Sequence, residues 1–109
     1  MTPDLASRKI IVAAYCYYVL DNPVMTDAQY DKLSIIVAEG WDELDPVRQW
    51  QLESAAATRA GGHHIKFTAF SVSAAYYQHS LFHRQYATRP LPTEWKERED
   101  GLRYVTATG

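Results

Sequence analysis

The sequence predicts a small all-α domain, a bundle of four to five helices that starts with an antiparallel helical hairpin. Three observations lead to this fold class: apolar residues recur at helical spacing, capping residues precede these segments, and proline or glycine follows them. The 109 residues are 47% hydrophobic and 22% charged, which is typical of a globular chain. A chain of this length buries one core, so we expect a single domain over residues 1–109.

The first two expected helices form the hairpin. Apolar residues recur at helical spacing over residues 3–20, and the Asp-Asn-Pro sequence at 21–23 interrupts them. Thr26 and Gln29 form a capping-box pattern, in which each side chain accepts a hydrogen bond from the backbone N–H of the other residue. This start signal and the apolar stripe behind it predict a second helix over residues 27–43.

The third expected helix follows directly. Asp45 places a capping carboxylate before Pro46 at the first helical position, and the helix is expected to end at Gly61 and Gly62. Residues 63–70 alternate weakly between polar and apolar, as in a short strand, but no partner strand is obvious. We therefore expect a loop there that leads into the next helix.

The rest of the chain adds a fourth helix and a short fifth one. Ser71 is expected to cap the fourth helix, which ends before the proline-rich residues 89–92. Thr93 then caps a short last helix over residues 94–99. The tail after Gly101 could add a short extended piece, and its small polar end is expected to fray.

Charge and cysteine usage narrow the range of partners and compartments. Eleven Lys and Arg against thirteen Asp and Glu give a net charge of -2, which implies no general attraction to nucleic acid or to anionic lipid. The one group of basic residues, within 84–103, is interleaved with acidic residues and predicts a solvated mixed surface.

Cys16 lies in an apolar helical run, so we expect a buried thiol and a reducing compartment. The apolar run is too short for a membrane span or signal peptide, which favours a cytoplasmic location.

A polar cluster lies beside the expected turn of the hairpin. Asp27 is in the first turn of the second helix, and Tyr30 and Asp31 share its face one turn later. The hairpin can bring Tyr17 and Tyr18, at the end of the first helix, opposite them. Tyrosines that stack or donate a hydroxyl, facing carboxylates that accept hydrogen bonds, suit a flat cationic ring with ribose hydroxyls. A pyridinium nucleotide has this chemistry.

Residues 17–33 resemble the N-terminal nicotinamide-mononucleotide-binding region of the NAD-dependent DNA ligases of bacteria. The pattern of that family runs Tyr-(His or Tyr)-x-x-Asp-x-Pro-x-x-x-Asp-x-x-Tyr-Asp-x-Leu, and every patterned position is filled here. The resemblance covers at most residues 5–44, and residues 45–109 are additional. It implies that Asp21 and Pro23 shape the turn and that Leu33 is core. It also implies that the following residues contact NAD or nicotinamide mononucleotide: Tyr17, Tyr18, Asp27, Tyr30 and Asp31.

The nucleophile that those ligases use has no counterpart here. In the family it is a lysine in a Lys-x-Asp-Gly motif of a further domain, and the nearest string in this chain begins with Arg98. A guanidinium is effectively never deprotonated and cannot act as that nucleophile. The chain is also too short for the catalytic fold. The sequence therefore gives no positive support for an enzyme and predicts a non-catalytic module that binds nicotinamide mononucleotide or the nicotinamide half of NAD.

Two other functions remain open at this stage. The first is a helical interaction protein, an inhibitory or accessory factor of viral or mobile-element origin, that uses the ligase-like hairpin as a scaffold. The chain is 13% aromatic, and the helix over residues 74–86 has more apolar surface than one small core covers, as at a protein interface or in a homo-oligomer. The second is assistance in trans to a separate nucleotidyltransferase.

A metal site has little support in the sequence. His79 and His83 stand at i and i+4, a spacing that can chelate zinc. His63 and His64 could complete such a site only if the glycine loop folded back onto this helix. We expect no metal.

Overall fold

The computed structural model describes residues 1–108 and is largely helical, which confirms the predicted fold class. A small three-stranded sheet accompanies the helices. Within the described residues, no helix has the length and apolar character needed to cross a membrane. In chain order the elements are α1 (Pro3–Tyr18), α2 (Asp27–Glu39), the 3-10 helix η1 (Trp41–Glu43), α3 (Pro46–Leu52), α4 (Ala55–Ala60), β1 (Phe67–Thr68), α5 (Ala69–His83), β2 (Lys96–Glu97) and β3 (Arg103–Val105).

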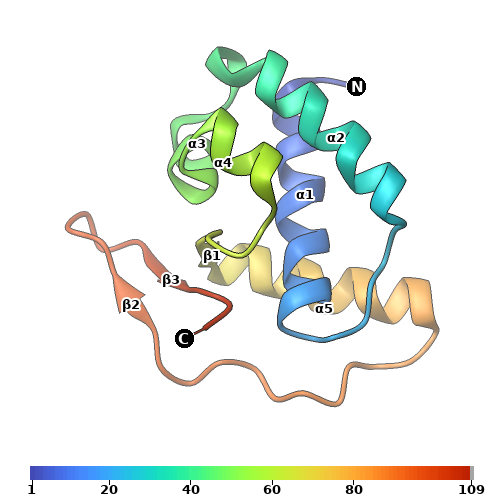
Figure 1. Cartoon of the computed structure of the whole chain (residues 1–109). Helices are drawn as coiled ribbons and strands as arrows, with labels where there is room; N and C mark the ends of the chain where they lie inside the picture. Colours follow the sequence, from blue (N-terminus) through green and yellow to red (C-terminus); the bar gives the residue numbers. More distant parts are fainter. Residues whose placement is uncertain (109) are drawn as a thin grey trace.

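Helix α1 is the centre of the molecule. It packs against α2 on one side, against α3 on another, and α5 crosses its C-terminal end (Figure 1). Because it has neighbours on several sides, α1 is buried around most of its circumference rather than along one stripe. Its fully buried apolar residues are Ala6, Ile10, Ile11, Ala14, Tyr15 and Cys16.

The hairpin of α1 and α2 forms nearly as predicted. Thr26 Oγ1 accepts from the Gln29 N–H at 3.1 Å, and the Gln29 side chain accepts from the Thr26 N–H at 2.8 Å, which confirms the capping box. Helix α1 ends at Tyr18 rather than Leu20, and Asp21 takes a left-handed conformation with φ 54°. This tight turn reverses the chain within a few residues.

Helix α2 is shorter than predicted. It ends at Glu39 rather than Glu43, and Trp41–Glu43 form the 3-10 helix η1. Gly40 lies where the end of α2 meets the start of α1, and a Cβ at this position would come within 2.2 Å of Pro3 Cγ. The close approach requires glycine, and the chain leaves the helix there.

The third helix was predicted wrongly as one element. It consists of α3 and α4, separated at Glu53, which has φ 78°. Ser54 caps α4 by accepting from the Ala57 N–H at 2.9 Å. Leu52 and Gln51 at the end of α3 are both fully buried. The break turns α4 towards α2, with which it packs.

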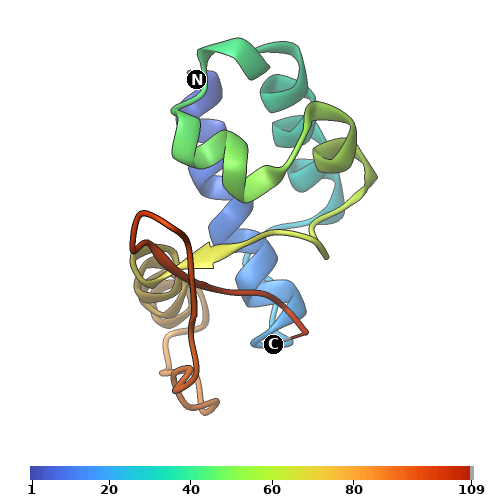
Figure 2. The same ribbon diagram turned by 90° about the vertical axis from the view of Figure 1, so that its left-hand side faces the viewer.

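The prediction of a fifth helix over residues 94–99 is wrong. Lys96–Glu97 form β2, which pairs antiparallel with β3, and β3 in turn pairs with β1. The partner strand that the sequence left unidentified for residues 63–70 is therefore the tail, with Phe67 opposite Val105. Figure 2 shows this tail passing in front of the start of α5, beside β1. The extended piece expected after Gly101 is confirmed as β3.

Helix α5 begins earlier than predicted. Thr68, not Ser71, is its N-cap, and Thr68 Oγ1 accepts from the Ser71 N–H at 3.2 Å. The buried face of the helix carries Val72, Ala75 and His79. Cys16 of α1 is fully buried against this face, with its Sγ 3.5 Å from the Ala75 carbonyl, and burial raises the pKa of the thiol to about 11. The prediction of a buried cysteine is confirmed.

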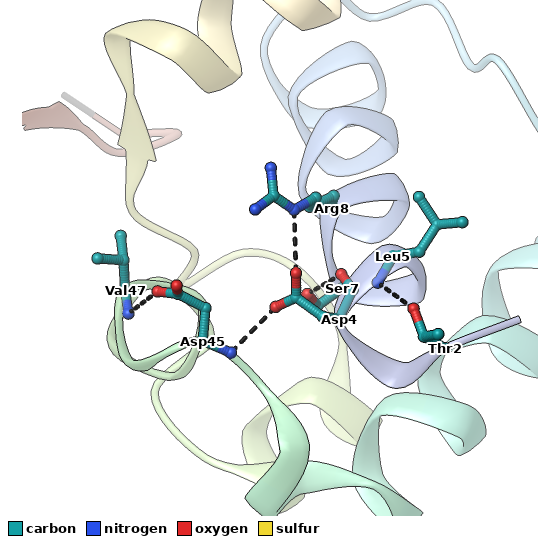
Figure 3. A network of polar contacts seen from close by, with 7 residues as sticks. All are labelled: Thr2, Asp4, Leu5, Ser7, Arg8, Asp45 and Val47. Atoms are coloured by element: carbon teal, nitrogen blue, oxygen red, sulfur yellow. Dashed lines mark hydrogen bonds and ion pairs between the residues drawn. The ribbon is translucent and has the colours of Figure 1, made fainter.

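A carboxylate joins the hairpin to the additional helices (Figure 3). Asp4, in the first turn of α1, accepts from the Asp45 N–H at 3.0 Å and from Arg8 Nε at 3.1 Å. Asp45 itself caps α3 by accepting from the Val47 N–H at 2.8 Å, as predicted. The hydrogen bond from the Asp45 backbone is the main cause of the lowered pKa of Asp4. One side chain thus fixes the start of α1 against the start of α3.

Candidate functional site

A pocket of about 180 Å³ opens at the turn between α1 and α2. Four of the five residues predicted for ligand contact line it: Tyr17, Tyr18, Asp27 and Tyr30. The turn itself contributes Pro23, Val24, Met25 and Thr26, while α1 contributes Ala13 and the end of α4 contributes Gly61. The pocket therefore combines apolar walls with one carboxylate and three tyrosines.

The two neighbouring tyrosines differ in how they are held. The rings of Tyr17 and Tyr18 meet edge to face, with centroids 4.9 Å apart. Tyr18 Oη accepts from the Gly62 N–H at 3.4 Å, and its ring lies edge to face with that of His63. Tyr17 is 51% exposed. Tyr18 is thus a fixed wall, whereas Tyr17 presents an accessible aromatic surface at the pocket.

The Tyr30 hydroxyl is buried and has no hydrogen-bond partner among the described residues. Burial, with a smaller contribution from Tyr18, raises the pKa of Tyr30 above its usual range, so the hydroxyl keeps its proton and remains a donor. A buried polar group without a partner costs about 1–3 kcal/mol.

Asp31 lies outside this pocket. It lines an adjoining hollow, also of about 180 Å³, in which Ser34, Thr58 and Arg59 take part. Asp27, Tyr30 and Gly61 belong to the walls of both spaces, so the two adjoin each other. Asp31 Oδ1 is 3.4 Å from Arg59 Nη1. The predicted cluster is therefore one surface with two compartments, and Asp31 belongs to the second.

Sequence reasoning missed the contribution of the loop after α4. Gly61 and Gly62 were interpreted only as a helix terminator, yet Gly62 also lies against the site. A Cβ at Gly62 would come within 2.7 Å of Tyr30 Oη, 3.0 Å of Tyr18 Cε2 and 3.0 Å of Ala14 Cβ. The second of two consecutive glycines was the available signal, because one glycine is enough to end a helix.

The histidines of α5 support the turn from outside. The Asn22 side-chain amide donates to Nε2 of His79 at 3.0 Å, and His83 Nε2 donates to the Pro23 carbonyl at 2.9 Å. The two rings lie 4.7 Å apart. Pro23 lines the pocket, so α5 holds one wall of it in place. The i, i+4 spacing that suggested a chelating pair instead serves these two contacts.

The size of the two compartments limits the ligand. Pockets for small molecules usually measure about 300–1,000 Å³. Each compartment is smaller, so a flat ring fits in one of them, and a ligand as large as a mononucleotide would extend across both.

One comparison with known proteins finds a family that this segment resembles. Residues 5–35 match the family model described as DNA ligase-like, N-terminal NAD+-binding domain. The match includes most of α1, the turn and the first turns of α2, and it confirms the predicted resemblance for this segment. It covers less than a third of the chain and ends short of residue 44. No curated protein matches the chain, and neither does any solved structure.

Proposed function

We propose that this chain is a non-catalytic module that binds nicotinamide mononucleotide, or the nicotinamide half of NAD, at the turn between α1 and α2. One observation carries the proposal: the segment that matches an NAD+-binding family opens into a pocket, and the second half of the chain leaves that pocket accessible. Had the second half covered these residues, a scaffold role would be the better explanation.

The side chains suit the nicotinamide group. A pyridinium ring would lie against the exposed ring of Tyr17 beside Tyr18, where aromatic faces attract a cation. The Asp27 carboxylate offers a negative charge and a hydrogen-bond acceptor in the same pocket. Tyr30, whose hydroxyl is buried, would support the ligand from the wall of the pocket.

The composition of the walls supports binding without catalysis. None of the residues that line the two compartments is a lysine, a cysteine or a histidine. In the ligases that this segment resembles, the corresponding hairpin orients the leaving group, and a lysine of another domain attacks the phosphate. Here the hairpin would hold the nucleotide without breaking a bond.

Calorimetric titration of the full chain with nicotinamide mononucleotide and with NAD tests the proposal. We expect saturable binding that Tyr17→Ala and Asp27→Asn each weaken about tenfold or more. Tyr77→Ala removes an exposed tyrosine of α5 and is the matched control, which should bind as the wild type does. Absence of heat at millimolar ligand would overturn the proposal. Binding that survives in a variant with both Tyr17→Ala and Asp27→Asn would place the ligand elsewhere.

A second candidate function rests on the outer face of α5. Phe70, Tyr77, Leu81 and Phe82 are each more than half exposed. The last three lie within residues 74–86, where the sequence predicts an apolar excess, and Phe70 adds to it. Such a face would serve as a contact with another protein or with a second copy of the chain. Light scattering of the wild type and of Tyr77→Glu tests the second copy, since an assembly through this face would dissociate in the variant.

A further inference from the structure

The second compartment contains a cation that sequence reasoning did not connect with the site. Arg59 lies in the last turn of α4, 28 positions after Asp31, and lines the compartment beside Asp31, Ser34 and Thr58. It is the only Lys or Arg among the residues that line either compartment. The packing of α4 on α2 therefore places one positive charge at a site that otherwise carries two carboxylates.

The present contacts of Arg59 are weak. Its Nη1 donates to the Asp31 carbonyl at 3.4 Å, to Asp31 Oδ1 at 3.4 Å and to Ser34 Oγ at 3.2 Å. These distances are at the long end of hydrogen bonding, and exposed ion pairs contribute little to stability. The side chains of Arg59 and Asp31 are 41% and 64% exposed, so separating them leaves no buried charge unpaired.

The geometry leaves donors available to a ligand. All three contacts use Nη1, and the described residues accept no hydrogen bond from Nη2 or Nε. A guanidinium with two N–H groups available suits the oxygens of a phosphate, which it binds in a bidentate manner. The hydroxyls of Ser34 and Thr58 line the same compartment and could add further contacts.

The two compartments differ in that only the second contains a cation. The first contains Asp27 and the tyrosines, which favour a cationic ring. The second contains the guanidinium of Arg59, which can bind an anion through the N–H groups that Asp31 does not occupy, beside the carboxylates of Asp27 and Asp31. A pyridinium nucleotide carries a positive ring and a negative phosphate separated by a ribose. Asp27 and Tyr30, in the shared wall, would lie between the two ends.

We propose that Arg59 binds the phosphate of the mononucleotide and makes the site selective for nicotinamide mononucleotide over nicotinamide riboside. The inference rests on the proposed function and deepens it. Arg59 lies outside residues 5–35, so this selectivity would come from the additional part of the chain and not from the matched segment.

The experiment compares two ligands on three proteins by calorimetry at low ionic strength. The ligands are nicotinamide mononucleotide and nicotinamide riboside, and the proteins are the wild type, Arg59→Ala and Lys32→Ala. Lys32 is an exposed cation next to Asp31 that lines neither compartment, so its removal controls for the change in net charge. Because Arg59 is exposed and only weakly paired, the variant should fold, and circular dichroism checks this.

We expect the wild type to bind the mononucleotide about tenfold or more tightly than the riboside. Arg59→Ala should lose this preference by weakening the mononucleotide alone, and Lys32→Ala should keep it. Equal affinity of the wild type for both ligands, or equal loss of both in Arg59→Ala, would overturn the role of Arg59 while the proposed function stands. If the wild type bound neither ligand, the proposed function itself would fail.

Discussion

The hairpin of α1 and α2 and the sheet region, which comprises β1, α5, β2 and β3, differ in what determines their structure. The hairpin depends on signals that lie within a few residues of one another, such as the Thr26–Gln29 capping box and the turn at 21–23. The sheet region depends on contacts between distant segments, such as Phe67 opposite Val105. The hairpin carries the candidate site, and the sheet region holds it in place.

This comparison shows that an element predicted from local sequence signals can still depend on distant parts of the chain for its stability. Helix α1 buries residues on the side that faces α5 as well as on the side that faces α2. Tyr15, which is 1% exposed, meets Phe67 of β1 edge to face at 5.0 Å. His79 and His83 hold the turn from α5. The folded hairpin therefore depends on contacts with the sheet region, although the sequence signals that predict the hairpin all lie within it.

The largest expected effect tests this dependence. Phe67→Ala removes a fully buried ring that joins β1 to α1 and should lower the free energy of unfolding by about 3–5 kcal/mol. We expect the helical circular dichroism signal and ligand binding to be lost in one cooperative transition. Phe70→Ala, which removes a 74% exposed ring, is the control and should change stability by about 0.5 kcal/mol or less. A hairpin that stayed helical after the rest unfolded would contradict the dependence.

The same comparison explains which parts of the fold the sequence predicts. Residues 94–99 follow Thr93, a good capping residue, and nothing local indicates that Lys96 and Glu97 pair with the tail. The break between α3 and α4 requires a positive φ at Glu53, a backbone conformation that non-glycine residues rarely adopt. The burial of Leu52 just before it stabilises the break. Tertiary contacts decide both, and they are not visible in a single sequence.

The candidate site divides in the same way. The five predicted residues all lie on the hairpin, and one contiguous sequence pattern is enough to identify them. Arg59 and Gly62 reach the site only through the packing of α4 on α2. Asp31 was expected beside the tyrosines from its helical spacing, and its face of α2 instead turns towards Arg59. Spacing fixes which residues share a helix face, whereas the neighbouring elements decide which compartment that face lines.

An intermediate effect is expected at the contact between the loop after α4 and the hairpin. Gly62→Ala would force a Cβ against Tyr30 and Ala14, which should lower the free energy of unfolding by about 1–3 kcal/mol. The displaced Tyr30 ring should also weaken nucleotide binding, measured by calorimetry. Gly101→Ala, at a turn with φ 90° far from the pocket, should cost stability through backbone strain and leave binding unchanged. Equal binding by both variants would mean that the loop plays no part in the site.

The smallest effect concerns the junction between α1 and α3. The folded pKa of Asp4 is lowered by the Asp45 N–H and by Arg8, so its contribution to stability is present above the unfolded value of about 4 and is lost as pH falls through the lower folded value. Asp4→Asn should therefore reduce stability by about 1 kcal/mol or less at pH 7, because the carboxylate is partly exposed to solvent.

This difference between wild type and Asp4→Asn should shrink as the pH drops below 4, in denaturant titrations measured from pH 7 to pH 3. Asp42→Asn changes an exposed carboxylate of η1 and should follow the wild type throughout. A constant difference between Asp4→Asn and wild type at every pH would show that the side chain acts through its shape and hydrogen-bond acceptors rather than its charge.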